Sequence, residues 1–290
     1  MFPVVKLRIG AVVLAGITLL VVQAVHAQLE LPLLGQEVIE SRLEDFSAGN
    51  SEREARLKKL FEDSGCKDDK LSEQPLKGKT PPNLICVLPG KSHAVILVGA
   101  HFDKVAAGDG VVDNWSGASL LPSLFQSLAG RPHQHSFVLV GFTEEEKGLV
   151  GSKFYLRHLT PLQRSRIKAM VNLDTLGLGP SEVWASHSDE SLLSDLAAVA
   201  RKMKLPLTEV NVEEVGTADS ESFAQYKIPR ITIHSVTPET WPILHSDRDR
   251  LSEIHMDDYY ATYRLLAAYL NYLDAFLEKF HSLETPEAAH

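Results

Sequence analysis

The sequence contains only two cysteines, Cys66 and Cys86, and they do not form a Cys-x-x-Cys motif. A zinc site built on thiolates is therefore excluded, because such sites need several cysteines at close spacing. Positive charge is also in the minority, with 29 Lys and Arg against 38 Asp and Glu and a net charge of −9. We find no basic stripe in the sequence and expect no nucleic-acid partner.

The chain also lacks internal repeats, low-complexity tracts and any linker that would divide it. Its 44% hydrophobic and 23% charged residues are typical of a globular protein, and 290 residues suffice for a sizeable core. We therefore expect a single domain over residues 28–290. Because no separate dimerisation insertion is evident, we expect a monomer.

Residues 1–27 have the three parts of a secretory signal peptide. Lys6 and Arg8 form a short basic region, residues 9–22 are apolar, and small residues end the segment. The alternative is an uncleaved membrane anchor, but the strictly apolar stretch is shorter than the roughly 20 residues that a membrane span needs. We expect a secreted or periplasmic protein whose mature chain begins at Gln28 and has no stable membrane association.

Export would place both cysteines in an oxidising compartment, where an even count favours a disulfide. We expect Cys66 and Cys86 to pair. Two separate buried thiols are the alternative.

The hydrophobic pattern changes along the chain. Residues 34–66 carry apolar residues at helical spacing and predict two amphipathic helices broken near Gly49 and Asn50, with a polar loop at 67–83 behind them. From Leu84 onward, short apolar runs typical of strands alternate with helical stretches. The expected strands lie at 84–90, 93–100, 135–142, 167–177, 182–186 and 228–235; the expected helices follow Ser116, Gly151 and Asp189, and the last one spans 257–281.

Strands that alternate with helices indicate βαβ units, and continuous apolar strands indicate a sheet that is covered on both faces. We therefore expect an α/β fold, a three-layer sandwich with a mixed, mostly parallel central sheet flanked by helices. Residues 28–80 would form a helical N-terminal extension packed on it. In open sheets of this kind, ligands bind at the carboxyl ends of the strands.

Histidines and carboxylates gather at four of the expected strand ends, or in the loops that follow them. These are His101, Asp103, Asp113, the run from Glu144 to Glu146, Asp174 and His245. Each alone is more often a helix cap or a loop residue, but together they predict a metal site. Imidazole and oxygen ligands without thiolates suit zinc, and also manganese or cobalt, and two such ions can share a bridging carboxylate. Asp103 would face the same side of its strand as His101 and accept the other ring proton of that histidine.

Five ordered motifs resemble those of the di-zinc exopeptidase family that contains the bacterial leucyl aminopeptidases, aminopeptidase Y and glutamate carboxypeptidase. They are GAHFD, GVVDNWSGAS, EEKGLVGS, NLDTLG and LHSDRDRL, and the resemblance runs from about His93 to the C-terminus. The animal glutaminyl cyclases share the fold. The resemblance implies two zinc ions with these ligands: His101 and Asp174 on one, Glu146 and His245 on the other, and Asp113 as the bridge. It also implies that Glu145 is the general base, while Glu144 would only be solvated.

The same resemblance assigns supporting roles. Asp103 matches a carboxylate behind His101, and Asp249 matches one near His245. Gly148, Gly151 and Ser152 fit the family pattern, in which we expect a tight turn and then a helix that begins at Ser152 as its cap.

Three residues are candidates for contact with the substrate. Asp219 and Phe223 lie in a segment similar to one beside the family's substrate pocket, although Asp219 could instead cap a helix that starts at Ser220. Trp115 either lines the pocket or belongs to the core. One position departs from the pattern: Leu244 stands where several secreted aminopeptidases have an aromatic residue that helps polarise the substrate carbonyl, and where glutaminyl cyclases have Trp.

The function that the resemblance implies is an exported exopeptidase, most directly an aminopeptidase acting on peptides with a free N-terminus. A hydroxide bridging two zinc ions would attack the first peptide carbonyl, and Glu145 would move the proton. The alternative is a glutaminyl-peptide cyclotransferase with one catalytic zinc. A scaffold that has lost turnover is disfavoured, because all five ligands and the base are present. The sequence leaves open the preferred side chain and the choice among amino-, carboxy- and dipeptidase.

Overall fold

The computed structural model of the chain describes residues 32–213 and 216–281. The predicted signal peptide lies outside these ranges. Within them, no helix is both long and apolar enough to cross a lipid bilayer.

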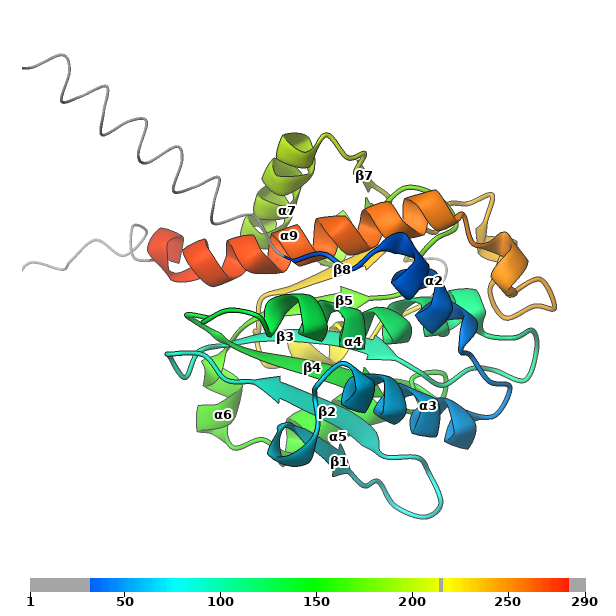
Figure 1. Ribbon diagram of the computed structural model, residues 1–290, viewed down its shortest axis with the longest axis horizontal. Coiled ribbons are helices and arrows are strands. Elements are labelled where there is room, and N and C mark those ends of the chain that lie inside the picture. The colour runs from blue at the N-terminus through cyan, green and yellow to red at the C-terminus, as the bar shows by residue number, and fades with distance from the viewer. Residues whose placement is uncertain (1–31, 214–215, 282–290) are drawn as a thin grey trace, which may run out of the picture.

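A central mixed sheet organises the described residues (Figure 1). Its strands are β1 (Leu71–Gln74), β2 (Asn83–Leu88), β3 (Val95–His101), β4 (Ser136–Phe142), β5 (Ile167–Leu173), β6 (Glu182–Val183), β7 (Thr208–Glu209) and β8 (Arg230–His234), in the order β1-β2-β4-β3-β5-β8-β6-β7. The four central strands β4, β3, β5 and β8 are parallel. Strands β1 and β2 pair antiparallel with their neighbours, and β6 pairs antiparallel with β8 but parallel with β7. The predicted mixed, mostly parallel sheet is confirmed.

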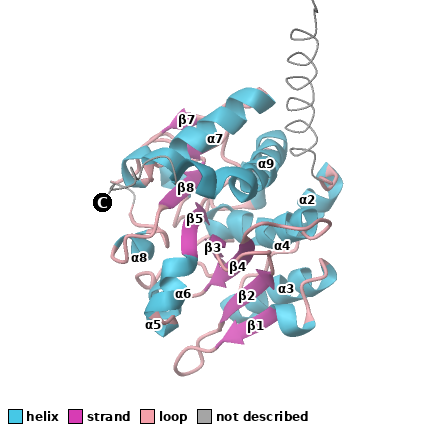
Figure 2. Ribbon diagram, turned by 90° about the vertical axis from the view of Figure 1, so that its left-hand side faces the viewer, coloured by secondary structure: helices cyan, strands magenta, loops and turns pink. Residues whose placement is uncertain are grey.

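Helices cover both faces of the sheet (Figure 2). They are α2 (Gln36–Glu44), α3 (Asn50–Asp63), α4 (Ser116–Leu128), α5 (Val150–His158), α6 (Pro161–Arg166), α7 (Glu190–Met203), α8 (Glu221–Ala224) and α9 (Met256–His281). Figure 2 shows α2, α3, α4 and α9 on one side of the sheet and α5, α6 and α8 on the other. The predicted three-layer sandwich is therefore confirmed.

The central strands are buried on both faces, which is why they read as continuous apolar runs. Two glycines within them permit close packing. A Cβ at Gly99 would lie 2.5 Å from the ring of Phe142, and one at Gly141 would lie 2.7 Å from the Leu57 side chain of α3. A larger residue at Gly141 would force the Leu57 side chain to move, so this glycine permits the close packing of α3 on the sheet.

Strand β1, helix α6 and the two-residue strand β7 lie where the sequence suggested no element. Strand β1 lies inside the stretch that we expected to be a polar loop, because its side chains are largely exposed and it pairs only with β2 at the sheet edge. Helix α6 begins with a capping box formed by Thr160 and Gln163, with Pro161 as its first residue. This Thr-Pro-x-Gln pattern is a sequence signal for the start of a helix, and we overlooked it.

Cys66 and Cys86 form a disulfide, as predicted, with both side chains fully buried. The bridge joins the turn after α3 to β2 and closes a loop with a sequence separation of 20 residues. It thereby ties the N-terminal helices to the edge of the sheet.

Removing this bridge is expected to destabilise the protein. Replacement of both cysteines by alanine should lower the free energy of unfolding by about 3 kcal/mol, because closing a loop of this length restricts the unfolded chain. Urea unfolding of the oxidised protein and of the Cys66→Ala, Cys86→Ala variant measures the difference. Equal midpoints and slopes would show that the bridge contributes nothing to stability.

Candidate active site

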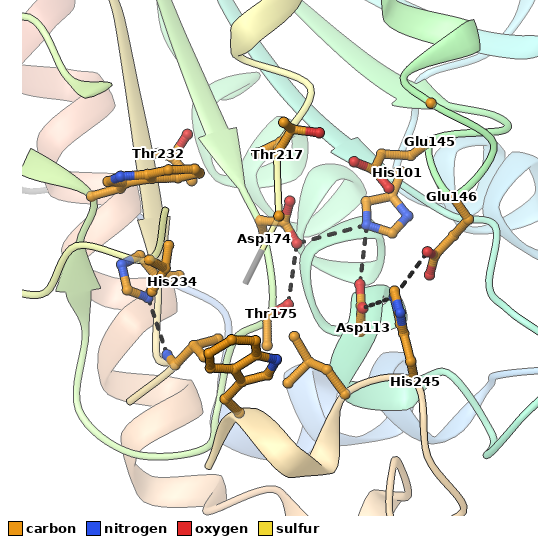
Figure 3. Close-up of a pocket in the computed structure, with 18 residues that line it drawn as sticks. His101, Asp113, Glu145, Glu146, Asp174, Thr175, Thr217, Thr232, His234 and His245 are labelled. Carbon is orange, nitrogen blue, oxygen red and sulfur yellow. Dashed lines mark hydrogen bonds and ion pairs between the residues drawn. The ribbon is translucent and has the colours of Figure 1, made fainter. Parts of the chain in front are cut away.

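The predicted metal ligands converge at the carboxyl ends of the parallel strands, around a cavity of about 340 Å³ (Figure 3). His101 is the last residue of β3, and Asp174 directly follows β5. Glu145 and Glu146 lie in the loop after β4, and His245 lies in the loop between β8 and α9. Parallel strands thus bring together side chains that are up to 144 positions apart in the sequence (101 to 245).

The ligand atoms form two groups that share Asp113. His101 Nε2 lies 3.2 Å from Asp113 Oδ1 and 3.6 Å from Asp174 Oδ1. His245 Nε2 lies 3.2 Å from Asp113 Oδ2 and 2.9 Å from Glu146 Oε2. Within each group the ligand atoms all lie within 4.8 Å of one another. The two oxygens of Asp113 therefore face two different histidine–carboxylate pairs, as a bridging ligand requires (Figure 3).

The chemistry of these groups fits a divalent cation. Four carboxylates line the cavity, and no Lys or Arg is among the described residues that do. Glu146 Oε1 is buried and has no hydrogen-bond partner in the described part of the chain. Imidazole nitrogens combined with carboxylate oxygens suit zinc.

Burial of negative charge raises the pKa values of two acids at the cavity. Burial raises the pKa of Glu145 to about 10; His101 opposes this, and Asp219 and Asp174 add to it. Burial also raises the pKa of Asp219 to about 7 against the opposing effects of His101 and the Ser152 hydroxyl. At both carboxyl groups burial outweighs the opposing effect of His101, and a bound metal would lower both pKa values.

His245 differs from the other ligands in backbone and exposure. Its φ of 56° lies in the left-handed region, which non-glycine residues adopt rarely. Its side chain is 56% exposed, whereas those of His101 and Asp113 are 2% and 7% exposed. This ligand therefore forms the solvent side of the site.

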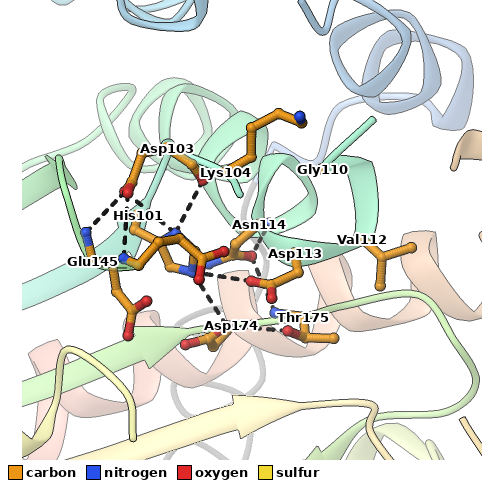
Figure 4. Close-up of polar contacts among 12 residues, drawn as sticks. His101, Asp103, Lys104, Gly110, Val112, Asp113, Asn114, Glu145, Asp174 and Thr175 are labelled. Atoms are coloured by element: carbon orange, nitrogen blue, oxygen red, sulfur yellow. Dashed lines mark hydrogen bonds and ion pairs between the residues drawn. The ribbon is translucent and has the colours of Figure 1, made fainter. Parts of the chain in front are cut away.

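Asp103 connects His101, the last residue of β3, to the loop that follows β4 (Figure 4). Its Oδ1 accepts a hydrogen bond from Glu145 N at 3.0 Å, and its Oδ2 accepts one from Glu146 N at 3.3 Å. His101 Nδ1 lies 3.5 Å from Asp103 Oδ1 and 3.3 Å from the main-chain oxygen of the same residue. Asp103 therefore holds His101, Glu145 and Glu146 in one arrangement.

Asp249 supports a different ligand from the one we expected. Its carboxylate accepts hydrogen bonds from Val112 N at 2.7 Å and from Asp113 N at 3.2 Å. No contact with His245 is among its described hydrogen bonds and ion pairs. Asp249 thus fixes Asp113, the predicted bridging residue, and the expectation that it supports His245 is corrected.

Asn114 is a positioning residue that we did not single out from the sequence. Its Nδ2 donates to Leu173 O at 2.9 Å, and its Oδ1 accepts from Thr175 N at 3.1 Å and from Gly117 N at 3.0 Å. These bonds fasten the loop that carries Asp113 to both sides of Asp174. A buried asparagine beside a ligand in the DNWSG motif was the available signal.

Arg53 of α3 was also missed. It is fully buried and donates to the main-chain oxygens of Phe102, Asp109 at 3.2 Å and Gly110 at 2.7 Å. These oxygens belong to the loop between His101 and Asp113, so the N-terminal helices help to shape the site. An arginine on an amphipathic helix gives no sequence signal of this role, because most such residues are solvated.

The structure does not bring Phe223 or Trp115 to the cavity. Phe223 is fully buried and packs against Phe142 in the core, because α8 turns its apolar face to the sheet. Trp115 is also fully buried, donates from Nε1 to Arg42 O at 3.2 Å and lies beneath the Arg53 guanidinium. For Trp115 the core alternative holds, and we no longer propose either residue as a substrate contact.

Asp219 lies just behind the cavity wall. It is fully buried, and neither carboxylate oxygen accepts a hydrogen bond of ordinary geometry from a described residue. It does not cap α8, which has no side-chain cap. Its neighbour Ala218 lines the cavity but Asp219 does not, and the charge of Asp219 adds to the raised pKa of Glu145.

The loop after β4 differs in two details from expectation. Glu144 is only 8% exposed and forms an ion pair with Lys147 at 2.6 Å, so it is not simply solvated. Helix α5 begins at Val150, and Ser152 does not cap it; its hydroxyl instead contacts Ser222 at 2.8 Å. Gly148 does adopt a positive φ of 95°, as a tight turn requires.

Aromatic and aliphatic side chains form the remaining wall of the cavity. They include Trp184, Val212, Val236, Trp241 and Leu244. We missed the two tryptophans because neither adjoins a recognisable motif. Leu244 lines the cavity without supplying a hydrogen-bond donor.

His234 also lines the cavity but is not available to a metal. Its Nε2 donates to Val210 O at 2.9 Å, and its Nδ1 accepts from Val236 N at 3.1 Å. Burial lowers its pKa to about 4. Both nitrogens of this neutral ring are occupied, which distinguishes it from His101 and His245.

Comparison with known proteins gives a consistent result. The model of peptidase family M28 matches residues 83–270, more than half of the chain. Aminopeptidase YwaD of Bacillus subtilis is 26% identical over 230 residues, which cover 76% of this chain and 48% of that protein. The chain spans about half or less of the length of the first curated relatives that it matches.

Solved structures share the fold. The LapA aminopeptidase of Legionella pneumophila matches with a TM-score of 0.69 and 19% identity, covering 86% of this chain and 78% of that one. A glutaminyl cyclase from an Acidobacteriales bacterium matches with a TM-score of 0.70 and 18% identity, covering 85% and 97%. Both likenesses concern the fold alone.

The contacts of Asp103 generate a prediction about metal affinity. Asp103→Asn should weaken zinc binding roughly 10- to 100-fold, because an amide presents a donor where three donors now converge, and outer partners of ligands have effects of this size. Competition titration against a chromogenic chelator measures the affinity. Glu144→Gln is the matched control in the same loop and should change it less than about threefold. Equal affinities of the two variants would exclude the positioning role.

Proposed function

Because the chain belongs to peptidase family M28, we propose that it is a zinc-dependent aminopeptidase that removes the N-terminal residue from peptides. The observation that carries this proposal is the placement of Asp113, whose two oxygens face two separate histidine–carboxylate pairs with Glu145 alongside. We further propose that two zinc ions bind there, one with His101 and Asp174 and the other with Glu146 and His245. Manganese or cobalt would suit the same ligands.

The lining of the cavity favours recognition of a free amine over a free carboxylate. No Lys or Arg is among its described lining residues, so a substrate carboxylate would find no cationic partner from the protein there. Glu145, the lining carboxylate that belongs to neither ligand group, would instead attract an ammonium group. This distribution supports an aminopeptidase rather than a carboxypeptidase or a dipeptidase.

The aromatic and aliphatic wall suits the side chain of the first residue. Trp184, Trp241 and Leu244 present apolar surface, and His234 is neutral. A charged side chain would lose its hydration against this wall without gaining a partner. We therefore propose uncharged, apolar N-terminal residues as preferred substrates.

Glu145 is proposed as the general base. It lines the cavity, its main chain is fixed by Asp103, and its side chain belongs to neither ligand group. Zinc, when bound, would act as a Lewis acid toward water and the peptide carbonyl. Glu145 would accept the proton of the attacking water at its carboxylate and pass it to the departing amine.

Export is a further part of the proposal. The signal-like segment at residues 1–27 supports it, and the Cys66–Cys86 disulfide fits an oxidising compartment. We propose a secreted or periplasmic enzyme that acts as a monomer on peptides.

Replacement of the base gives the first functional test. Glu145→Gln should lower kcat by about 10²- to 10⁴-fold, because proton transfer is lost while the amide keeps the shape of the side chain. Hydrolysis of leucine p-nitroanilide, with zinc content measured on the same samples, checks this. Glu144→Gln is the control and should keep kcat within about threefold. A fully active Glu145→Gln enzyme with its zinc bound would refute the assigned role.

Metal removal gives the second test. Dialysis against a chelator should abolish release of free amino acid from unblocked peptides, and added zinc should restore it. Elemental analysis should find two zinc ions per chain. One zinc together with ammonia release from Gln-peptides, and no free amino acid, would instead establish the glutaminyl cyclotransferase alternative.

A further inference from the structure

A second cavity lies at the opposite end of the central strands. Its volume is about 560 Å³, and it is bounded by α6, the start of β5, the turn before β8 and Leu277 of α9. The catalytic cavity lies at the carboxyl ends of the same strands, so the length of these strands separates the two sites. A volume of this size is in the range of small-molecule sites.

The floor of this cavity is apolar. Ile167, Ile228 and Leu277 line it, and each is about 5 or 6% exposed. Pro229 and the ring of Tyr226 complete the wall. An apolar body bound here would leave water without displacing a polar partner.

Three cations line the same cavity, and no acid is among its described lining residues. Arg164, Lys168 and Lys227 form no ion pair within residues 32–213 and 216–281. The Arg164 guanidinium lies 4.7 Å from the centre of the Tyr226 ring and is held by the main-chain oxygens of Leu156, at 2.9 Å, and Leu159. Lys168 Nζ donates to Ser165 O, at 3.1 Å.

This concentration of positive charge is unusual for a chain with a net charge of −9. The segment 147–173 contains no Asp or Glu. It contains six Lys or Arg, of which Arg164 and Lys168 line this cavity, whereas Lys147 pairs with Glu144 in the loop after β4. These cations are confined to one segment, so the net charge of the whole chain does not reveal them. The apolar centre of the cavity distinguishes it from a surface that binds only the phosphates of a nucleic acid.

We propose that this cavity binds a single organic anion with an apolar body, of the class of medium-chain fatty acids. The apolar chain packs on Ile167, Ile228 and Leu277, and the carboxylate meets Arg164, Lys168 and Lys227. Charge-assisted hydrogen bonds from these cations select the anion over a neutral analogue. The site is independent of the zinc ligands, so it does not rest on the proposed peptidase activity.

The test uses decanoate as the anionic probe and decanol as its neutral counterpart. Both are titrated calorimetrically into the full zinc-loaded protein below the concentration at which decanoate forms micelles. We expect one decanoate per chain, bound at least tenfold more tightly than decanol.

Variants at exposed positions assign the site without disturbing the fold. Lys168→Gln with Lys227→Gln should weaken decanoate binding at least tenfold and leave decanol unchanged, so that the preference for the anion disappears. Lys202→Gln on α7 makes the same kind of charge change elsewhere and should alter binding less than twofold.

Three results would overturn the proposal. The first is equal binding of decanoate and decanol, and the second is decanoate binding that survives the double variant. The third is binding to phosphatidylglycerol vesicles through these lysines without binding of monomeric decanoate, which would make the surface a membrane contact instead.

Discussion

Crowded carboxylates in a buried pocket are the constraint on which the rest of the site depends. Asp113, Glu145, Glu146 and Asp174 line one cavity, and no Lys or Arg joins them among the described residues. Such a group repels itself unless a cation is bound, because burial strengthens the interaction between like charges. With a metal bound, the two histidines would supply nitrogen ligands without adding charge of their own. A pair of divalent cations is the simplest way to stabilise this arrangement.

The protein positions these ligands through hydrogen bonds to their main chain rather than through ion pairs with their carboxylates. Asp103 accepts from the amides of Glu145 and Glu146, and Asp249 accepts from the amide of Asp113. Asn114 binds the main chain on both sides of Asp174. Hydrogen bonds of this kind leave the carboxylate oxygens of the ligands free to face a metal, and they fix the separation of loops that arise from different strands.

Much of the fold and the ligand set was predictable from the sequence, because both depend on local patterns. Apolar runs predicted the central strands, and parallel strands send their following loops to one edge, so His101 and Asp174 had to lie near each other. The role of Arg53 was not predictable in this way, since its contacts with the loop between His101 and Asp113 lie 49 to 57 positions away. The expected role of Asp249 was wrong for a related reason. It is four positions from His245 in the sequence, yet its carboxylate accepts hydrogen bonds from the main chain at Val112 and Asp113. Phe223 shows that a motif position does not establish on which side of a short helix the ring lies.

The bridging position of Asp113 is tested most directly by a crystal structure of the zinc-loaded protein with anomalous scattering measured on both sides of the zinc absorption edge. Two peaks are expected on either side of the Asp113 carboxylate, one with His101 and Asp174 and one with Glu146 and His245. A single peak, or two peaks that do not share Asp113, would contradict the two-zinc site and the hydrolytic function built on it.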